Sequence, residues 1–288
     1  MKKFTFKLWA VLLLMLVSLQ TFATDNKYGL KDNIQDGVIL HCFDWTYEQI
    51  KEELPNIAAA GFSAVQTSPA HPREPVGAAW YMLYQPYDYK VGENGLGTKE
   101  GLTELCTEAH QYGVKIIVDV VANHINGNLS YVASFWQDKS LYHDYQGGID
   151  YSKRWQVTHG RIGMWDLKTE DSRVQEKIKE YVAELKSCGV DGIRWDAAKH
   201  IGLPSEGDTF WQNVPDQTMY NYGEILDGTS GDDTVSEKVE VVSQTTGVQL
   251  HPVAGESSAK AMIYNLQGQR VDANYRGVVV CNGRKYVQ

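Results

Sequence analysis

Two carboxylates in this chain of 288 residues, Asp196 and Glu224, have the sequence surroundings that nucleophilic or acid–base chemistry requires. Asp196 follows Arg194 by two positions in the run GIRWDAAKH, and residues two apart on a strand point to the same face. A guanidinium beside a carboxylate lowers its pKa and keeps it ionised. We therefore expect an oriented, charged Asp196 that can act as a nucleophile. The alternative for such a motif is a purely structural Arg–Asp pair.

Glu224 lies at the end of a predicted strand, where Gly223 precedes it and the apolar Ile225 and Leu226 follow. Apolar surroundings raise the pKa of a carboxyl group by desolvation, which keeps it protonated and able to donate a proton. The alternative is an ordinary surface glutamate. The pattern predicts that Glu224 is a general acid or base that works beside Asp196.

The elements that must position these side chains alternate between strand and helix. We predict strands over residues 38–43, 62–67, 114–121, 190–195 and 219–225. Between the first two, Thr46 and Gln49 form a capping box that begins a helix; Pro55 is expected to break or restart it, and Gly61 to end it. Strands that alternate with helices indicate a parallel α/β sheet, and polar groups at the carboxyl ends of its strands are typical of a (β/α)8 barrel.

The chain is too short after residue 226 to complete such a barrel. A whole barrel takes about 250 residues and each βαβ unit about 30. We therefore predict an incomplete (β/α)8 TIM-type barrel over 24–226, with a long insert at 125–170, a linker at 227–258 and a small β module at 259–288. Two open sheet edges would result, so self-association is expected.

Three runs resemble the first three signature regions of the alpha-amylase family, the family 13 glycoside hydrolases; they cover residues 119–124, 192–200 and 222–226. The fourth signature, a strand that ends in His-Asp, has no counterpart, because His143-Asp144 lies in the insert and follows no buried strand. The resemblance implies that Asp196 is the nucleophile and Glu224 the acid/base of a retaining mechanism, with carboxyl groups about 5 Å apart. It also implies cleavage of α-1,4-glucosidic bonds in starch-like polysaccharides or maltooligosaccharides.

The same resemblance assigns further residues. Tyr84-Gln85-Pro86 is similar to the family's Tyr-Gln-Pro, whose tyrosine stacks on the sugar. The substrate-binding residues it implies are Tyr84, Gln85, Asp119, His124, Arg194, Lys199 and His200. It implies that the insert is a domain B, and that Asn123, Asp166 and the backbone carbonyl of His200 hold calcium, for which oxygen ligands are suitable. Ordinary hydrogen bonds between these three residues are the alternative.

Composition and the first residues indicate an exported protein. Lys2, Lys3 and Lys7 precede an apolar run that is too short to span a bilayer, so residues 1–23 are predicted to be a signal peptide rather than a membrane anchor. The protein is then secreted or at the cell surface. The formal charge of −9 disfavours a nucleic-acid partner. The spacing of the four cysteines does not suggest a zinc site, and Cys42, Cys106 and Cys188 are expected to be buried thiols.

The sequence leaves three hypotheses about the function open. The first is an active alpha-amylase-like glycosidase. The second is a starch-binding or vestigial relative without turnover, because the third family carboxylate and the last strands are missing. The third is an incomplete product that folds poorly. Starch hydrolysis and a cooperative thermal transition would distinguish them.

Overall fold

The computed structural model describes residues 27–73, 79–92, 94–145 and 147–225, and the backbone of four short strands between residues 263 and 287. Its main sheet has five strands in the order β1 (Ile39–Cys42), β2 (Ala64–Thr67), β3 (Lys115–Val121), β6 (Gly192–Asp196) and β7 (Tyr220–Gly223). Every neighbouring pair is parallel. This confirms the predicted parallel α/β sheet.

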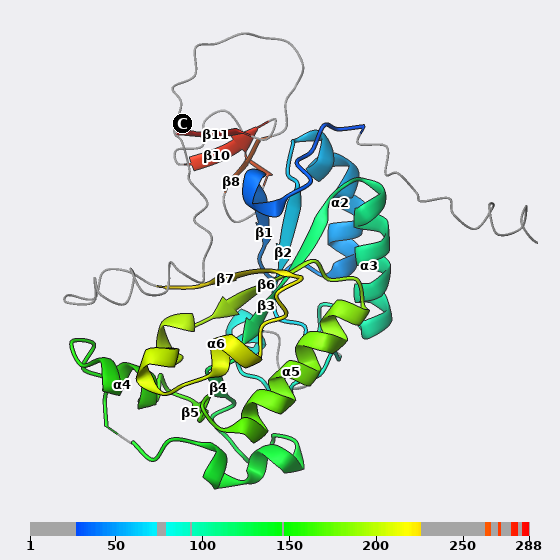
Figure 1. Cartoon of the computed structure of the whole chain (residues 1–288). Coiled ribbons are helices and arrows are strands. Elements are labelled where there is room, and N and C mark those ends of the chain that lie inside the picture. Colours follow the sequence, from blue (N-terminus) through cyan, green and yellow to red (C-terminus); the bar gives the residue numbers. More distant parts are fainter. Residues whose placement is uncertain are drawn as a thin grey trace, which may run out of the picture.

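Three long helices, α2 (Tyr47–Ala59), α3 (Lys99–Gln111) and α5 (Ser172–Ser187), lie along one side of the strands (Figure 1). Their apolar faces and the outward residues of the strands share one continuous core. In β3, for example, Ile116, Val118 and Val120 alternate with Ile117 and Asp119, so that one set enters this core and the other faces the opposite side of the sheet.

The opposite face of the sheet carries a much smaller apolar cluster. It contains Ile34, Ala64 and Ile117, with the half-buried Ile39, Tyr220 and Tyr222 packed against it. In a closed barrel this face would be filled by the side chains of further strands. Among the described residues, β1 and β7 are the two edges of the five-stranded sheet. The barrel is therefore incomplete, as predicted.

Local sequence signals set the ends of α2. The side chain of Thr46 accepts from the backbone N–H of Gln49 at 3.1 Å and the Gln49 side chain accepts from Thr46, which confirms the capping box. Gly61 follows the helix with a φ of 88°, a conformation that favours glycine. The predicted break at Pro55 is wrong, because the helix runs through it. Pro55 has no N–H to bond the backbone carbonyl four residues earlier. Because Pro55 is exposed, this carbonyl is on the solvent side of the helix.

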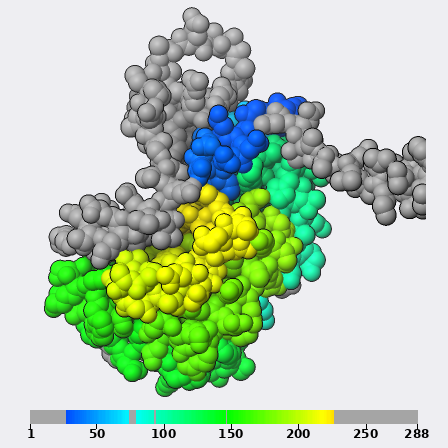
Figure 2. Space-filling model, viewed as in Figure 1, coloured from blue at the N-terminus to red at the C-terminus, as the bar shows by residue number. Residues whose placement is uncertain are grey.

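The insert between β3 and α5 is held against the sheet by a two-stranded ribbon. β4 (His124–Ile125) pairs antiparallel with β5 (Trp165–Asp166), and between them lie the 3-10 helices η3 (Ser134–Gln137) and η4 (Lys139–Leu141) and the short helix α4 (Arg154–His159). In the space-filling view, the yellow segment that follows β6 lies against the green insert (Figure 2). This yellow segment contains η5 (Ala198–His200), η6 (Pro204–Glu206) and α6 (Phe210–Asn213).

A second, antiparallel sheet lies in the region predicted as a C-terminal β module. Its strands are β8 (Ile263–Asn265), β9 (Arg270–Val271), β10 (Val278–Cys281) and β11 (Arg284–Val287), in the order β11-β10-β8-β9. The predicted signal peptide (1–23) and linker (227–258) lie outside the described residues, so the domain boundaries remain predictions.

Cys42, Cys106 and Cys188 are buried free thiols, as expected. In the described part of the chain, no helix has the length and apolar character needed to cross a membrane.

Candidate active site

A cavity of about 460 Å³ opens at the carboxyl ends of the strands, where the predicted site residues converge. Asp196 ends β6, Glu224 directly follows β7, and both line the cavity. Its other lining residues are His41, Phe43, Trp80, Tyr84, His124, Tyr151, Ile162, Met164, Arg194, Ala197, Lys199 and His200.

Arg194 joins three carboxylates at one wall of this cavity. Its Nη1 lies 2.8 Å from Oδ1 of Asp196, and its Nη2 lies 2.5 Å from Oε1 of Glu224. Nη1 also contacts both oxygens of Asp119, at 2.7 and 2.8 Å. The shared guanidinium therefore holds both carboxylates at the same wall of the cavity.

The strand register produces this cluster. Asp119 of β3 is paired with Arg194 of β6, which in turn is paired with Tyr222 of β7. Asp119 is fully buried and does not line the cavity, and the Tyr84 hydroxyl also donates to it at 3.0 Å. Asp119 therefore lies behind the cavity wall, where it orients Arg194 and Tyr84.

The charge balance of the cluster reverses one expectation. Burial and the neighbouring Asp119 carboxylate together raise the pKa of Asp196 to about 8, and Arg194 only partly opposes them. Arg194 lowers this pKa as predicted, but the prediction that it keeps Asp196 ionised is wrong, because one guanidinium faces three carboxylates in a buried site. In the absence of substrate, this cluster favours holding a proton.

The carboxyl group of Glu224 lies in more polar surroundings than its apolar neighbours suggested. Besides Arg194, it accepts a hydrogen bond from the backbone N–H of Ala197 at 3.1 Å. Ala197 has a φ of 49°, a left-handed conformation that is uncommon outside glycine and is found preferentially at functional sites. This turn after β6 aims the N–H group at Glu224 and so fixes the position of its carboxylate.

Two histidines supply neutral imidazoles to the cavity wall. Burial lowers the pKa of His124 to about 4, and burial together with the charge of Arg194 lowers that of His41 to about 4. Nε2 of His124 lies 3.0 Å from the backbone carbonyl of Tyr84, which fixes the orientation of the ring. Both rings are therefore uncharged at neutral pH, and Nε2 of His41, which has no hydrogen-bond partner among the described residues, can bond a neutral hydroxyl group.

Aromatic rings form another wall of the cavity. Tyr84 stacks on Phe43 with ring centroids 6.3 Å apart and an angle of 19°, and Trp80 packs edge-on against Tyr84. Trp80 is 53% exposed, an unusual exposure for a tryptophan. Lys199 lies 5.3 Å above the ring of Tyr151. A flat apolar ligand can stack on such a surface.

The structure brings most of the predicted site residues together and leaves two outside. Tyr84, His124, Arg194, Lys199 and His200 line the cavity with Asp196 and Glu224, whereas Asp119 and Gln85 do not. Seven lining residues were not predicted: His41, Phe43, Trp80, Tyr151, Ile162, Met164 and Ala197. His41 and Phe43 had a usable signal, since they lie at the carboxyl end of the first predicted strand.

The three predicted calcium ligands also meet. Asn123 Nδ2 lies 2.9 Å from Oδ1 of Asp166 and 3.2 Å from the backbone carbonyl of His200. Rotating the Asn123 amide by 180° would place its oxygen toward these two oxygens, an arrangement that only a cation can stabilise. Burial raises the pKa of Asp166 to about 6, although the hydrogen bond from His143 lowers it. The donor set of buried oxygens therefore fits a calcium ion.

Comparison with known proteins shows the family. The model of the alpha-amylase catalytic domain matches residues 44–277, and the chain belongs to this family. It is 40% identical over 227 residues to an alpha-amylase of Clostridium acetobutylicum and 31% identical over 247 residues to one of Butyrivibrio fibrisolvens. Each alignment covers 72% of this chain, but the chain spans only 30% and 25% of the length of these relatives.

Solved alpha-amylase structures share the fold over the same region. The alpha-amylase of Malbranchea cinnamomea superimposes with a TM-score of 0.59 at 26% identity, over 68% of this chain and 49% of that one. A maltohexaose complex of alpha-amylase I from Eisenia fetida gives a TM-score of 0.62 at 23% identity, over 70% of this chain and 48% of that one. These neighbours have TIM barrels, and the described residues of this chain form a five-stranded parallel sheet that is consistent with an incomplete barrel.

Proposed function

We propose that this chain is a secreted retaining glycosidase that hydrolyses α-1,4-glucosidic bonds of starch-like glucans. The observation that carries the proposal is the placement of Asp196 and Glu224 on one guanidinium at the wall of an aromatic-lined cavity. The complex of the Eisenia fetida relative with maltohexaose supports a carbohydrate ligand. Export rests on the predicted signal peptide at residues 1–23.

In the first step, the Asp196 carboxylate attacks the anomeric carbon and forms a covalent glycosyl ester. Glu224 donates its proton to the glycosidic oxygen, so the leaving sugar departs as an alcohol. In the second step, Glu224 takes a proton from a water molecule, whose oxygen attacks the anomeric carbon and releases Asp196. Arg194 positions both carboxylates through its two terminal nitrogens.

The cavity wall provides the remaining contacts. A pyranose ring stacks on Tyr84 and Trp80, the ring of His124 contacts the sugar, and the neutral His41 hydrogen-bonds a hydroxyl group through Nε2. Lys199, at the other side of Asp196, contacts the sugar beyond the cleaved bond. A calcium ion held by Asn123, Asp166 and the His200 carbonyl would fix the insert to the sheet by its positive charge.

One observation favours a second candidate function, starch binding without turnover. Among the described residues that line the cavity, only Asp196 and Glu224 are carboxylates, whereas the family uses a third to grip sugar hydroxyls and distort the ring. The apparent sequence substitute, His143-Asp144, does not supply it, because neither residue lines the cavity.

Reducing-sugar release from soluble starch tests the proposal. We expect hydrolysis that is lost in Asp196→Asn and in Glu224→Gln, while circular dichroism shows that both variants melt cooperatively. A folded wild-type chain that binds maltohexaose without releasing reducing sugar would establish the second candidate. A chain without a cooperative transition and without activity would overturn both functions.

A further inference from the structure

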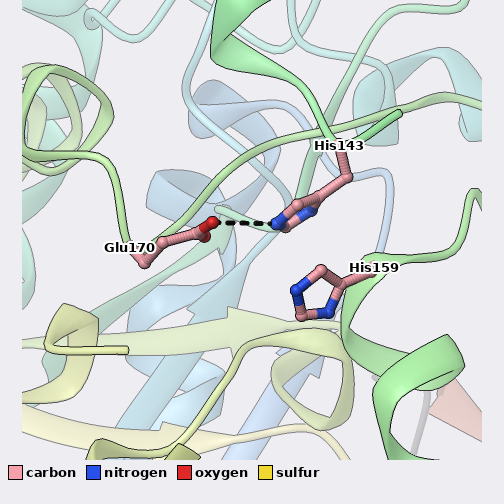
Figure 3. A group of neighbouring side chains, drawn as sticks. All are labelled: His143, His159 and Glu170. Carbon is pink, nitrogen blue, oxygen red and sulfur yellow. Dashed lines mark hydrogen bonds and ion pairs between the residues drawn. The ribbon is translucent and has the colours of Figure 1, made fainter. Parts of the chain in front are cut away.

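Three side chains outside the sugar cavity approach one another at the junction of the insert and α5. His143 follows η4, His159 ends α4, and Glu170 precedes the N-cap of α5. Each offers one nitrogen or oxygen atom, and these atoms all lie within 4.8 Å of one another. Figure 3 shows the Glu170 carboxylate and the His143 ring pointing toward each other, with the His159 ring beside that of His143.

The contacts of His143 leave its Nε2 facing Glu170. Nδ1 of His143 lies 2.6 Å from Oδ2 of Asp166, and a carboxylate oxygen accepts, so Nδ1 carries a proton. Nε2 lies 3.2 Å from Oε1 of Glu170. Burial opposes it, but the hydrogen bonds with Asp166 and Glu170 raise the pKa of His143 to about 9. Without a metal, Nε2 therefore holds a proton toward Glu170, and a metal ion would take the place of that proton. A carboxylate that orients the far nitrogen of a histidine is the usual arrangement around metal-binding histidines.

His159 presents its Nε2 for the same reason. Its Nδ1 lies 3.1 Å from the backbone carbonyl of Trp155 and 2.9 Å from the hydroxyl of Thr158, so Nδ1 is engaged within the chain. Nε2 has no hydrogen-bond partner among the described residues. The Trp155 ring stacks on the His159 ring at 4.7 Å and 21°, which holds its orientation. Burial lowers the pKa of His159, which favours the neutral ring that can ligate a metal.

The cluster borders a space that can hold an ion and water. A cavity of about 130 Å³ is lined by all three side chains together with Thr158 and Asp208. The 3.2 Å between His143 and Glu170 matches the separation of about 3.3 Å for two ligands at ~2.0 Å from a tetrahedral zinc ion. The two residues thus already stand at ligand spacing, and a small rotation of His159 would close the third side.

We propose that His143, His159 and Glu170 bind a divalent transition-metal ion, with Zn²⁺ as the expected occupant. Two imidazole nitrogens favour zinc over calcium, which takes oxygen ligands. The ion ties the end of α4 to the start of α5, and Asp166 links it to the Asn123–Asp166–His200 set. The fourth ligand is water from the cavity. The competing explanation is a protonated His143 that donates to Asp166 and Glu170 without any metal.

Zinc titration of the full-length chain, followed by calorimetry, tests this site. Calcium is kept in excess so that oxygen sites are filled, and a Cys281→Ser background removes the cysteine whose side chain lies outside the described residues. We expect one equivalent of Zn²⁺ to bind, and at least tenfold weaker binding in His159→Gln and in Glu170→Gln. His110→Gln is the matched control, because it removes another partly exposed histidine with a carboxylate partner, Asp191 at 2.8 Å.

A second measurement keeps the test valid if a variant is poorly folded. When Co²⁺ replaces Zn²⁺, the wild-type chain and His110→Gln should show the visible absorption of a four-coordinate cobalt site. His159→Gln should not show this absorption. Zn²⁺ should also raise the melting temperature of the first two proteins but not of the third. Absence of stoichiometric zinc binding, or equal affinity in all the proteins, would overturn the site and establish the proton-mediated pairing. Starch hydrolysis does not enter either readout.

Discussion

Nη1 of Arg194 contacts both carboxylate oxygens of Asp119, at 2.7 and 2.8 Å, from a position directly beside it in the neighbouring strand. Because Asp119 is fully buried, this contact does not meet substrate. It fixes the guanidinium that in turn holds Asp196 and Glu224. Asp119 is therefore a positioning residue that also adds negative charge to the site.

The negative charge of Asp119 should affect how the rate of hydrolysis depends on pH. Asp196 must be ionised to attack, and burial with the Asp119 carboxylate raises its pKa to about 8, so kcat/KM should fall as the pH drops below about 8. Replacing Asp119 with Asn removes a negative neighbour, which moves this limb to lower pH while the plateau activity falls. Initial rates on maltohexaose between pH 4 and 10 measure it. An unchanged limb in Asp119→Asn would mean that Asp119 does not influence Asp196.

Asp196→Asn should melt at a higher temperature than the wild-type chain in alkaline solution. A carboxyl whose folded pKa is raised from 3.8 to about 8 favours the folded state only when protonated. Its contribution is present below about pH 4 and is lost as the pH rises toward 8. The variant, which cannot ionise, should therefore gain stability relative to wild type from pH 5 to pH 9, with roughly 2–4 °C for each kcal/mol. Calorimetry measures the melting temperatures of both proteins at pH 5 and pH 9. If the variant's advantage over wild type is no larger at pH 9 than at pH 5, the prediction is contradicted.

Local sequence patterns were sufficient to predict the strands of the five-stranded sheet and the face of the sheet to which the main site residues point. The alternation of apolar and polar residues in 190–196 predicted that Arg194 and Asp196 share a face, and both line the cavity. The capping box at Thr46 set the start of α2 as expected. Pro55 was misread because the consequence of its missing N–H depends on whether that position faces solvent, which the local pattern does not give.

The pKa of the main site residue could not be predicted from its neighbours in the sequence. The pKa of Asp196 depends on Asp119 and Glu224, which come from strands far apart in the sequence. Trp80 was missed for a related reason: it lies in a short 3-10 helix after β2 that carries no strand or helix periodicity. Its position in the cavity follows from the way this segment folds over the sheet.

Calcium should stabilise the chain through Asn123, Asp166 and the His200 carbonyl. An ion that binds only the native state at 100 times its Kd adds about 2.7 kcal/mol, which is on the order of 5–10 °C in melting temperature. We expect this increase on adding Ca²⁺, its loss with a chelator, and its absence in Asn123→Ala. Differential scanning fluorimetry measures all three. If the wild-type melting temperature does not respond to Ca²⁺, the three residues are only hydrogen-bonded to one another.

Trp80 should contribute to sugar binding more than an equally exposed aromatic elsewhere. Trp80 lies against Tyr84 at the cavity wall, and Tyr131 has the same exposure, 53%, without lining the cavity. A stacked ring contributes about 0.5–1.5 kcal/mol, so Trp80→Ala should weaken maltohexaose binding two- to tenfold. Tyr131→Ala is the control and should leave the affinity unchanged. Binding is measured in the Asp196→Asn background to prevent cleavage, and equal affinities for the two variants would remove Trp80 from the binding surface.

The incomplete barrel should associate with itself in solution. β1 and β7 are the edges of the five-stranded sheet in the described part of the chain, and unpaired edges invite pairing with other chains. The apolar cluster of Ile34, Ala64 and Ile117 adds a driving force, since the half-buried Tyr220 of β7 is packed against it. Tyr220→Lys should place a charge on this edge and reduce association, whereas Tyr131→Lys, which changes an exposed tyrosine of the insert, should not. Size-exclusion chromatography with light scattering, run over a range of concentrations, measures the mass of each protein. A wild-type chain that stays monomeric, melts cooperatively and hydrolyses starch would show that the missing strands are dispensable.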